Sequence, residues 1–137
     1  MRVVVDTGVF SASLSRRRRP WFEAEVRRLA GNQLFLAAVT VSELRYGALV
    51  AGWGVPRRAR LEEAIAAATV VPVSDNLLTT AAELRFACRR EGHPLADRAH
   101  ANDLWIAASA IHIGAPLPTA DGIFDRAPGL AQLSRPT

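Results

Sequence analysis

Short apolar strands alternate with longer helical segments along the chain, and this alternation constrains the fold more than any other feature. The clearest strand is the β-branched run Arg2–Val5, which ends at Asp6. Strands that alternate with helices favour an α/β domain with a mainly parallel sheet. The sequence predicts four strands and one further strand-like piece: Arg2–Val5, Leu34–Ala38, Val70–Val73, Pro116–Thr119 and, near the end, Ala131–Leu133.

The segments between these strands carry the periodicity and end signals of helices. Ser74 precedes a long periodic segment as an N-cap, and Gly31 and Gly114 follow two others as stop signals. No internal repeat or long linker interrupts the pattern, so residues 1–137 are expected to form one domain. We expect helices at about Thr7–Leu14, Trp21–Ala30, Thr40–Val50, Arg57–Ala68, from the Ser74 cap to Glu91, and Arg98–Ile113.

Composition excludes several classes of protein. Hydrophobic residues make up 50% of the chain and charged residues 22%, which predicts a buried core and not a disordered tail. The longest apolar stretch, around Ala64–Val73, is far shorter than the roughly 18 residues of a membrane span. The start at Met1 has no signal-peptide pattern, so we expect a cytoplasmic protein. The single cysteine, Cys88, excludes an internal disulfide and a multi-cysteine zinc site.

The charge balance is unusual because all 17 basic residues are arginine and none is lysine. Without lysine, little titrates between neutrality and the arginine range, so a net charge of only +4 gives a pI of about 10.9. The high pI is therefore weak evidence for nucleic-acid binding, and the distribution of charge is better evidence. The missing lysine excludes a Walker-A lysine, a Schiff-base lysine and a lysine general base.

Four acidic residues fall at or near the same edge of the predicted sheet. Asp6 ends the first strand, and Asp121 follows the last core strand by two residues. Glu43 lies in the first turn of a predicted helix after the second strand, and Asp103 lies early in the helix before the fourth. In such sheets the active crevice lies outside the carboxyl ends of the strands. Converging carboxylates repel one another, and Mg²⁺ or Mn²⁺ with oxygen ligands relieves that repulsion. The pattern predicts a divalent-cation site that activates water for phosphodiester hydrolysis.

Each acidic residue also has a structural interpretation. Asp6 and Asp121, which precedes Gly122, suit turns. Thr40-Val-Ser-Glu43 fits a helix capping box, and Asp103 suits the dipole at a helix start. The hypothesis of one shared site therefore depends on all four residues lying near one edge together.

Four blocks of sequence carry a family resemblance. They are Asp6-Thr7 after the first strand, Thr40-x-Ser-Glu43-Leu44-x-x-Gly47, Asn102-Asp103-Leu-Trp-Ile-Ala-Ala-Ser-Ala, and Thr119-x-Asp121-x-x-Phe124 followed by Pro128-Gly129-Leu130. In order and spacing, from residue 2 to about 133, the chain resembles the PIN-domain ribonucleases, and more narrowly the VapC toxins of bacterial toxin–antitoxin pairs.

The resemblance implies a PIN-like three-layer α/β/α domain with a mainly parallel sheet of four to five strands. It also implies a Mg²⁺- or Mn²⁺-dependent endoribonuclease that cuts structured RNA, is blocked by a VapB-type antitoxin and forms a homodimer. By this resemblance Asp6, Glu43 and Asp103 bind the main metal, and Asp121 completes the pocket or serves a second metal.

Further residues are assigned supporting roles by the same resemblance. Thr7 and Thr119 match positions where a hydroxyl orients ligands or water, and Asn102 is a supporting candidate beside the third acid. The chain also departs from the pattern, because relatives often carry an acid where Ile123 stands. Asp125, two residues further on, is left open as a substitute. The remaining candidate is a rival ligand, Asp97, which is better interpreted as an N-cap before Arg98.

The basic clusters have two interpretations. The run Arg16, Arg17, Arg18, Arg19 is either a solvated loop or a contact for RNA phosphates or an acidic antitoxin segment. A second cluster comprises Arg57, Arg58 and Arg60. Neither cluster has interleaved aromatics, so neither predicts a base-stacking platform.

Other residues are predicted to be structural. They are the histidines His93, His100 and His112 and the thiol of Cys88. Trp53 is also predicted to have a packing role, in preference to a role as an exposed anchor. Leu44, Leu49 and Val50 recur near helical spacing, which suits the core or a groove for a partner helix.

The sequence admits two alternative functions. A phosphatase with an aspartate nucleophile is disfavoured, because it needs a second acid two residues after the first, where this chain has Gly8. A receiver domain is disfavoured as well, because both classes need a lysine and the chain has none. A catalytically silent PIN-like module that binds RNA or protein is the remaining alternative, although an idle site has no reason to keep four repelling carboxylates.

Overall fold

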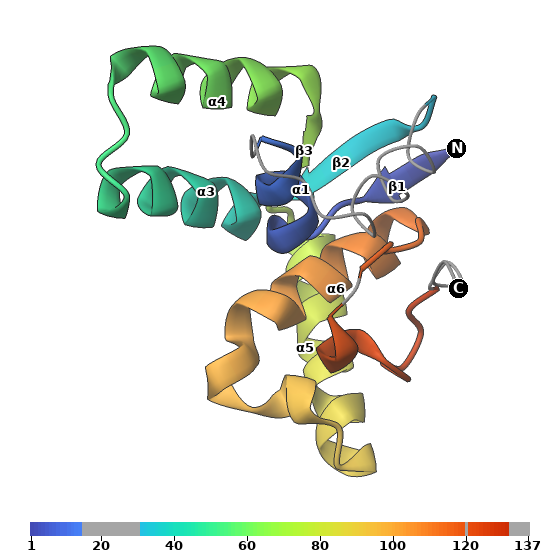
Figure 1. The fold of residues 1–137 in the computed structure, drawn as a ribbon. Helices are drawn as coiled ribbons and strands as arrows, with labels where there is room; N and C mark the ends of the chain where they lie inside the picture. Colours follow the sequence, from blue (N-terminus) through green and yellow to red (C-terminus); the bar gives the residue numbers. More distant parts are fainter. Residues whose placement is uncertain (15–30, 120, 132–137) are drawn as a thin grey trace.

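The computed structural model describes residues 1–14, 31–119 and 121–131. Within these ranges, three parallel strands form one sheet: β1 (Arg2–Val4), β2 (Gln33–Ala37) and β3 (Thr69–Val71). The strand order is β1-β2-β3, so β2 is central and pairs with both neighbours (Figure 1). The predicted α/β class with a parallel sheet is confirmed.

Five α-helices of the described chain follow and connect the strands. Ser74 caps α5 as predicted, since its hydroxyl oxygen accepts a hydrogen bond from the Leu77 amide at 3.2 Å. Gly92 and Gly114 end α5 and α6 in the left-handed conformation, with φ of 70° and 64°. The helices are α1 (Thr7–Ser13), α3 (Ala38–Val50), α4 (Val55–Ala67), α5 (Asp75–Glu91) and α6 (Ala101–Ile113), with 3₁₀ turns η1 (Pro94–Ala96), η2 (Arg98–His100) and η3 (Gly122–Phe124).

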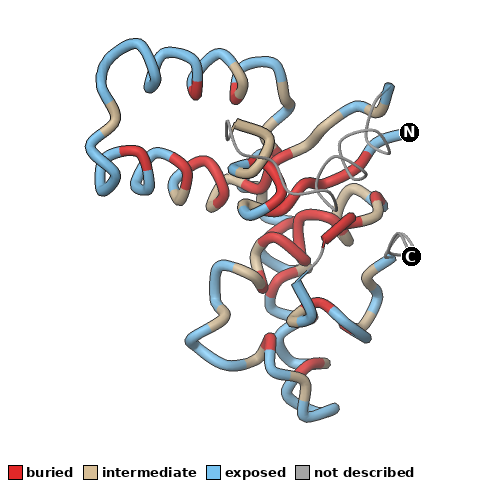
Figure 2. Tube along the Cα trace, in the orientation of Figure 1, coloured by how far each residue is buried: buried red, intermediate tan, exposed pale blue. Residues whose placement is uncertain are grey.

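The core lies on both faces of the sheet, because successive strand residues point to opposite sides. Val4 and Ala37 belong to a cluster with α5 and α6. Val3 and Leu36 belong to a second cluster, with α1, α3 and α4. Figure 2 shows these buried strand and helix segments in red at the junction of the layers. The helices therefore cover both faces, as the predicted three-layer arrangement requires.

The prediction of a fourth strand at Pro116–Thr119 is wrong for the described chain, where the sheet has three strands and not four to five. The segment lies beside β1, and the Val4 amide donates to the Pro116 carbonyl at 3.0 Å. Pro116 and Pro118 have no amide hydrogen, so they cannot continue a ladder. On its other side, the Leu117 amide donates to the carbonyl of Ala131 at 3.1 Å.

Three helix starts differ from their predictions, and one of them is α4, which begins at Val55 and not at Arg57. Helix α3 begins at Ala38, two residues early, with Ala37 as its N-cap. Helix α6 begins at Ala101 and not at Arg98, because His100 has non-helical φ and ψ of −112° and 24°. The Asp97 side chain makes no capping hydrogen bond, although this residue directly precedes η2.

Some predictions fall on residues outside the described ranges. These are the Trp21–Ala30 helix, the Arg16–Arg19 cluster and most of the Ala131–Leu133 piece. No helix of the described chain is long and apolar enough to span a membrane.

Candidate active site

Asp6 is the most buried acidic residue of the candidate site, with 7% of its surface exposed. It follows β1 and caps α1, so one carboxylate oxygen, Oδ1, accepts a hydrogen bond from the Val9 amide at 2.7 Å. The other, Oδ2, accepts a hydrogen bond from the Thr119 hydroxyl. Burial raises the pKa of Asp6, and the charges of Asp121 and Asp103 raise it further, whereas the bonds from Thr119 and Val9 oppose the rise.

Glu43 is held by Thr7, which is in turn hydrogen-bonded to Thr40. The Thr7 hydroxyl donates to Glu43 Oε1 at 2.9 Å and lies 3.2 Å from the hydroxyl oxygen of Thr40. A hydroxyl has one proton, so Thr40 is the donor of the second bond when Thr7 donates to Glu43. Thr40 is fully buried inside α3 and is not its N-cap, so the capping-box interpretation of this segment is wrong. Glu43 consequently lies in the second turn of α3 and not in the first.

Asp103 lies in the first turn of α6 and faces the same space. His100 Nδ1 is 3.4 Å from Asp103 Oδ2, one helical turn away. Burial raises the pKa of Asp103, and the charges of Asp121 and Glu43 add to the rise, while His100 opposes it. The shifts of Asp6 and Asp103 have the same origin, because each carboxylate loses water and faces like charges.

Asp121 is exposed and precedes η3. Its Oδ1 accepts from the Ile123 amide at 3.0 Å, so the turn interpretation of this residue is also correct. The Asp121 amide donates to the Thr119 hydroxyl oxygen at 3.0 Å. Thr119 therefore links Asp121 to Asp6. Its hydroxyl oxygen accepts a hydrogen bond from the Asp121 amide, and its hydroxyl proton is donated to Asp6 Oδ2.

The four carboxylates share one cavity of about 330 Å³, which we call the acidic cavity. Within the described chain, no three His, Cys, Asp or Glu side chains are close enough together to hold a metal ion among themselves. Mg²⁺ typically takes one or two protein carboxylates and keeps several waters, so an open site of this kind fits its donor preferences. The lining comprises Asp6, Thr7, Gly8, Val9, Ala12, Glu43, Asp103, Ile106, Asp121 and Phe124.

Not every predicted candidate lies at this cavity. The Asn102 and Asp125 residues are exposed, and neither lines it. Asp97 lines different hollows, beside α5. The Arg16–Arg19 cluster lies outside the described residues, so the structure says nothing of its position.

The sequence alone predicts structural roles for two residues of the site. Thr40 matches a helix cap, and His100 is predicted to be structural like the other histidines. The available signal is spacing: Thr40 precedes Glu43 by three residues on one face of α3, and His100, the N-cap of α6, precedes Asp103 by three. The structural interpretations of His93 and Cys88 agree with the structure. His93 bonds the Leu95 amide and the Asp125 carbonyl, and Cys88 is fully buried.

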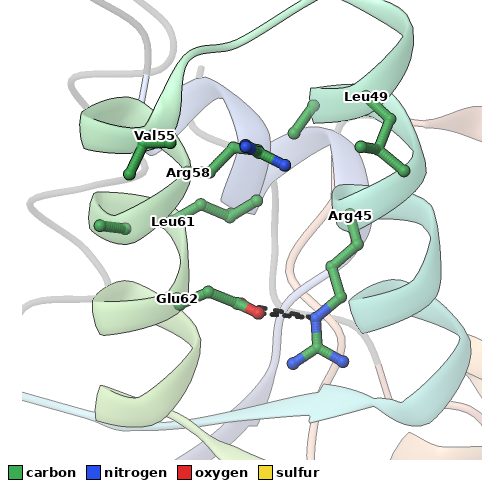
Figure 3. Close-up of a pocket in the computed structure, with 8 residues that line it drawn as sticks. Arg45, Leu49, Val55, Arg58, Leu61 and Glu62 are labelled. Atoms are coloured by element: carbon green, nitrogen blue, oxygen red, sulfur yellow. Dashed lines mark hydrogen bonds and ion pairs between the residues drawn. The ribbon is translucent and has the colours of Figure 1, made fainter.

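A second hollow of about 420 Å³ lies between α3 and α4 (Figure 3). Figure 3 shows Arg45 and Leu49 reaching in from α3, opposite Val55, Arg58, Leu61 and Glu62 of α4. Arg45 Nε and Glu62 Oε1 form an ion pair at 2.8 Å across it. Leu49 is 64% exposed, which is unusual for a leucine on a packed helix pair. We call this hollow the α3–α4 groove.

The parallel sheet, with carboxylates gathered beyond its strand ends, defines a class of protein. The sequence matches the PIN domain family over residues 3–130, and the chain belongs to that family. It is similar to Ribonuclease VapC5 of Mycobacterium tuberculosis (strain ATCC 25618 / H37Rv), with 33% identity over 132 residues. This match covers 95% of the chain and 90% of that protein. The chain is thus a VapC-like PIN-domain protein.

Solved structures agree with this assignment. VapBC-5 of Mycobacterium tuberculosis, a member of the VapBC family of toxin–antitoxin systems, matches with 31% identity and a TM-score of 0.66. The alignment covers 96% of this chain and 98% of that one. VapBC2 from Rickettsia felis, bound to a DNA fragment from their promoter, matches with a TM-score of 0.79 and coverage of 97% and 98%. Its identity is only 22%, so this second likeness supports the fold alone.

Proposed function

We propose that this chain is a divalent-metal-dependent endoribonuclease that acts as the toxin of a VapBC-type toxin–antitoxin pair. The observation that carries the proposal is the acidic cavity, where the buried Asp6 faces Asp103 and Asp121 at the carboxyl edge of the sheet. The similarity to Ribonuclease VapC5 supports the choice of RNA as substrate.

The donor set of the cavity fits Mg²⁺ or Mn²⁺. Of Asp6, Glu43 and Asp103, one or two would hold the ion directly, and the rest would reach it through bound water. Asp121 would complete the site or serve a second ion. A bound ion of this kind lowers the pKa of a water and polarises the scissile phosphate. No lining residue of the described cavity is cationic, so a phosphodiester could approach these carboxylates only if a cation neutralised them.

The protein's own contribution is to fix the carboxylates in place. Asp6 is locked by the Val9 amide and the Thr119 hydroxyl, and its rotation is therefore restricted. Glu43 is oriented through the hydroxyls of Thr7 and Thr40. Such outer contacts tune ligand orientation and metal affinity. No histidine is needed as general base in this scheme, which gives His100 a positioning role beside Asp103.

We also propose a VapB-type antitoxin as partner, with the α3–α4 groove as its contact surface, and a homodimer as the assembly. An exposed apolar rim of Tyr46, Leu49 and Val50 beside this groove suits a partner helix. Because RNA is the substrate, the cytoplasm is the expected compartment. Leu49→Asp should abolish co-purification with a tagged VapB-type antitoxin, whereas Val73→Asp, an exposed apolar control outside the groove, should not.

The direct test of the nuclease is RNA cleavage by the purified, antitoxin-free chain. Wild type and Asp103→Ala are compared on total RNA, with Mn²⁺ and with EDTA. We expect discrete fragments only from the wild type with Mn²⁺, because the carboxylate set is then complete. Full activity of Asp103→Ala would contradict the assignment, and activity in EDTA would contradict the role of a metal.

A further inference from the structure

A further charged hollow lies on α5, distinct from the acidic cavity and from the α3–α4 groove. It has a volume of about 610 Å³ and is lined by Arg85, Phe86 and Arg89, together with Ala82 of the same helix and Ala96 and Asp97 of the following connection. We call it the α5 groove. Its lining is basic and aromatic, whereas the acidic cavity has carboxylates and no cation.

Phe86 is the unusual residue of this groove. A phenylalanine on a helix normally packs into the core, but this side chain is 62% exposed. The Arg90 guanidinium carbon lies 5.8 Å from its ring centroid, which is within cation–π range. An exposed aromatic ring beside guanidinium groups is the combination that stacks on nucleic-acid bases and contacts phosphates.

The arginines of the groove are available for a ligand. Arg85 and Arg89 are exposed and one helical turn apart, so they share one face of α5. In the part of the chain that the structure describes, the ion pairs are Arg45–Glu62 and His100–Asp103, and neither includes these two arginines. Asp97 is the one acid that lines the groove. The lining therefore has a net positive charge and suits a polyanion.

The α5 groove continues toward the helix that carries Asp103. A neighbouring hollow of about 250 Å³ shares Ala82, Arg85 and Asp97 with the groove and extends to Arg98 and Trp105. Arg98 begins η2, the turn that leads directly into α6. Figure 1 shows this connection running from the lower end of α5 to the start of α6. A strand bound in the groove would thus approach the turn before Asp103.

We infer that the α5 groove binds a single-stranded segment of the RNA substrate, with a base stacked on Phe86 and phosphates held by Arg85 and Arg89. This inference rests on the proposed function and deepens it, because it assigns substrate binding to residues outside the acidic cavity. In the sequence, the denser basic clusters are Arg16–Arg19 and Arg57–Arg60. The fold adds the hollow beside the exposed Phe86, which Ala96 and Asp97 of the following connection complete.

The test is RNA binding in EDTA, measured by fluorescence anisotropy with a short fluorescein-labelled single-stranded RNA of mixed sequence. EDTA keeps binding separate from cleavage. The double variant Arg85→Ala/Arg89→Ala should weaken binding about tenfold or more, and the slope of log K against log salt should fall by about 1.4. Phe86→Leu should weaken binding about fivefold without changing that slope.

The matched control is Arg57→Ala/Arg60→Ala, which removes two exposed arginines of α4 that line neither the α5 groove nor the α3–α4 groove. This control should bind the RNA at least threefold more tightly than the groove double variant. Equal loss in both double variants would mean that only net charge matters, and would overturn the inference. Unchanged binding in the groove variants would overturn it too. Circular dichroism melting of each variant confirms that the chain is folded.

A polyglutamate probe separates RNA from an acidic protein segment. If the groove variants lost polyglutamate binding but kept RNA binding, the groove would fit an acidic partner and the inference would be wrong. Failure of the proposed function looks different. Asp103→Ala would then cleave RNA as well as the wild type, while the groove variants would still lose RNA binding.

Discussion

The acidic cavity and the α5 groove hold their charges in opposite ways. In the cavity, Asp6 is buried and each of its oxygens has a donor, while Glu43 is held by the Thr7 hydroxyl. In the groove, Arg85 and Arg89 are exposed, and neither forms an ion pair within the described chain.

This difference shows that each region suits a different kind of ligand. Fixed, partly dehydrated carboxylates repel one another, and a small divalent cation relieves that repulsion at a defined position. Exposed guanidinium groups keep their hydration and their freedom, so they suit a flexible polyanion whose counterions are released on binding. The two proposals therefore predict that chemistry at the acidic cavity and substrate binding at the α5 groove can be separated by mutation.

The largest effect is expected from Asp6→Asn, which removes the most buried charge of the acidic cavity. RNA cleavage with Mn²⁺ should fall by about 10³-fold or more, because the metal site loses its central carboxylate. RNA binding in EDTA should not fall, because the α5 groove is intact. Asp75→Asn, an exposed acid at the start of α5, is the control and should keep its activity. Loss of RNA binding in Asp6→Asn would break the separation between the two regions.

A smaller effect is expected from Thr40→Val, which removes a buried hydroxyl while conserving volume. The variant lacks the hydrogen bond between Thr40 and Thr7, so Thr7 would orient the Glu43 carboxylate less firmly. Activity or metal affinity should therefore fall by about 10- to 100-fold. The readout is the Mn²⁺ concentration that gives half-maximal cleavage. Thr40→Ser keeps the hydroxyl and should restore most of the metal response. An equal defect in both variants would indicate a packing role for Thr40.

The smallest effect concerns stability. The pKa of Asp103 is raised in the fold, so its charged form is disfavoured there. The stabilisation that it contributes is present below the unfolded pKa of 3.8 and is lost as pH rises through the folded pKa. In EDTA, Asp103→Asn should therefore melt a few degrees above wild type at pH 7, and the gap should close as pH falls below 4.

Thermal melts across this pH range measure the difference, and Mn²⁺ supplies the second comparison. Added Mn²⁺ should raise the melting temperature of the wild type more than that of Asp103→Asn. If Asp103→Asn melted below the wild type at pH 7 in EDTA, the carboxylates of the acidic cavity would not repel one another as proposed.

The parts of the structure that depend on local chemistry could be predicted from the sequence. The β-branched run of β1 and the Ser74 cap of α5 are local signals, and both were placed within a residue. The convergence of Asp6 and Glu43 follows from the rule that parallel strands end at one edge, because these residues come after β1 and β2. Asp121 lies at the same cavity although the segment before it, Pro116–Thr119, is not a strand.

The remaining features depend on contacts between distant segments. Thr40 satisfies a capping-box pattern, and only its partner Thr7, 33 residues away, shows that its hydroxyl serves Glu43 instead. Pro116 and Pro118 interrupt a segment whose apolar character predicts a strand. Helical periodicity alone places Phe86 on the side of α5 opposite the buried Leu77 and Leu84. The hollow beside Phe86 could not be inferred, because Ala96 and Asp97 of the α5–α6 connection complete its lining.

The most direct test of the central claim, that the acidic cavity is a divalent-metal site, is titration of the antitoxin-free chain with Mn²⁺ by isothermal calorimetry. We predict saturable binding to the wild type and its loss in Asp6→Asn, with the Asp75→Asn control binding as the wild type does. A wild type without measurable Mn²⁺ affinity would identify a silent PIN-like binding module, and equal binding by Asp6→Asn would place the metal elsewhere.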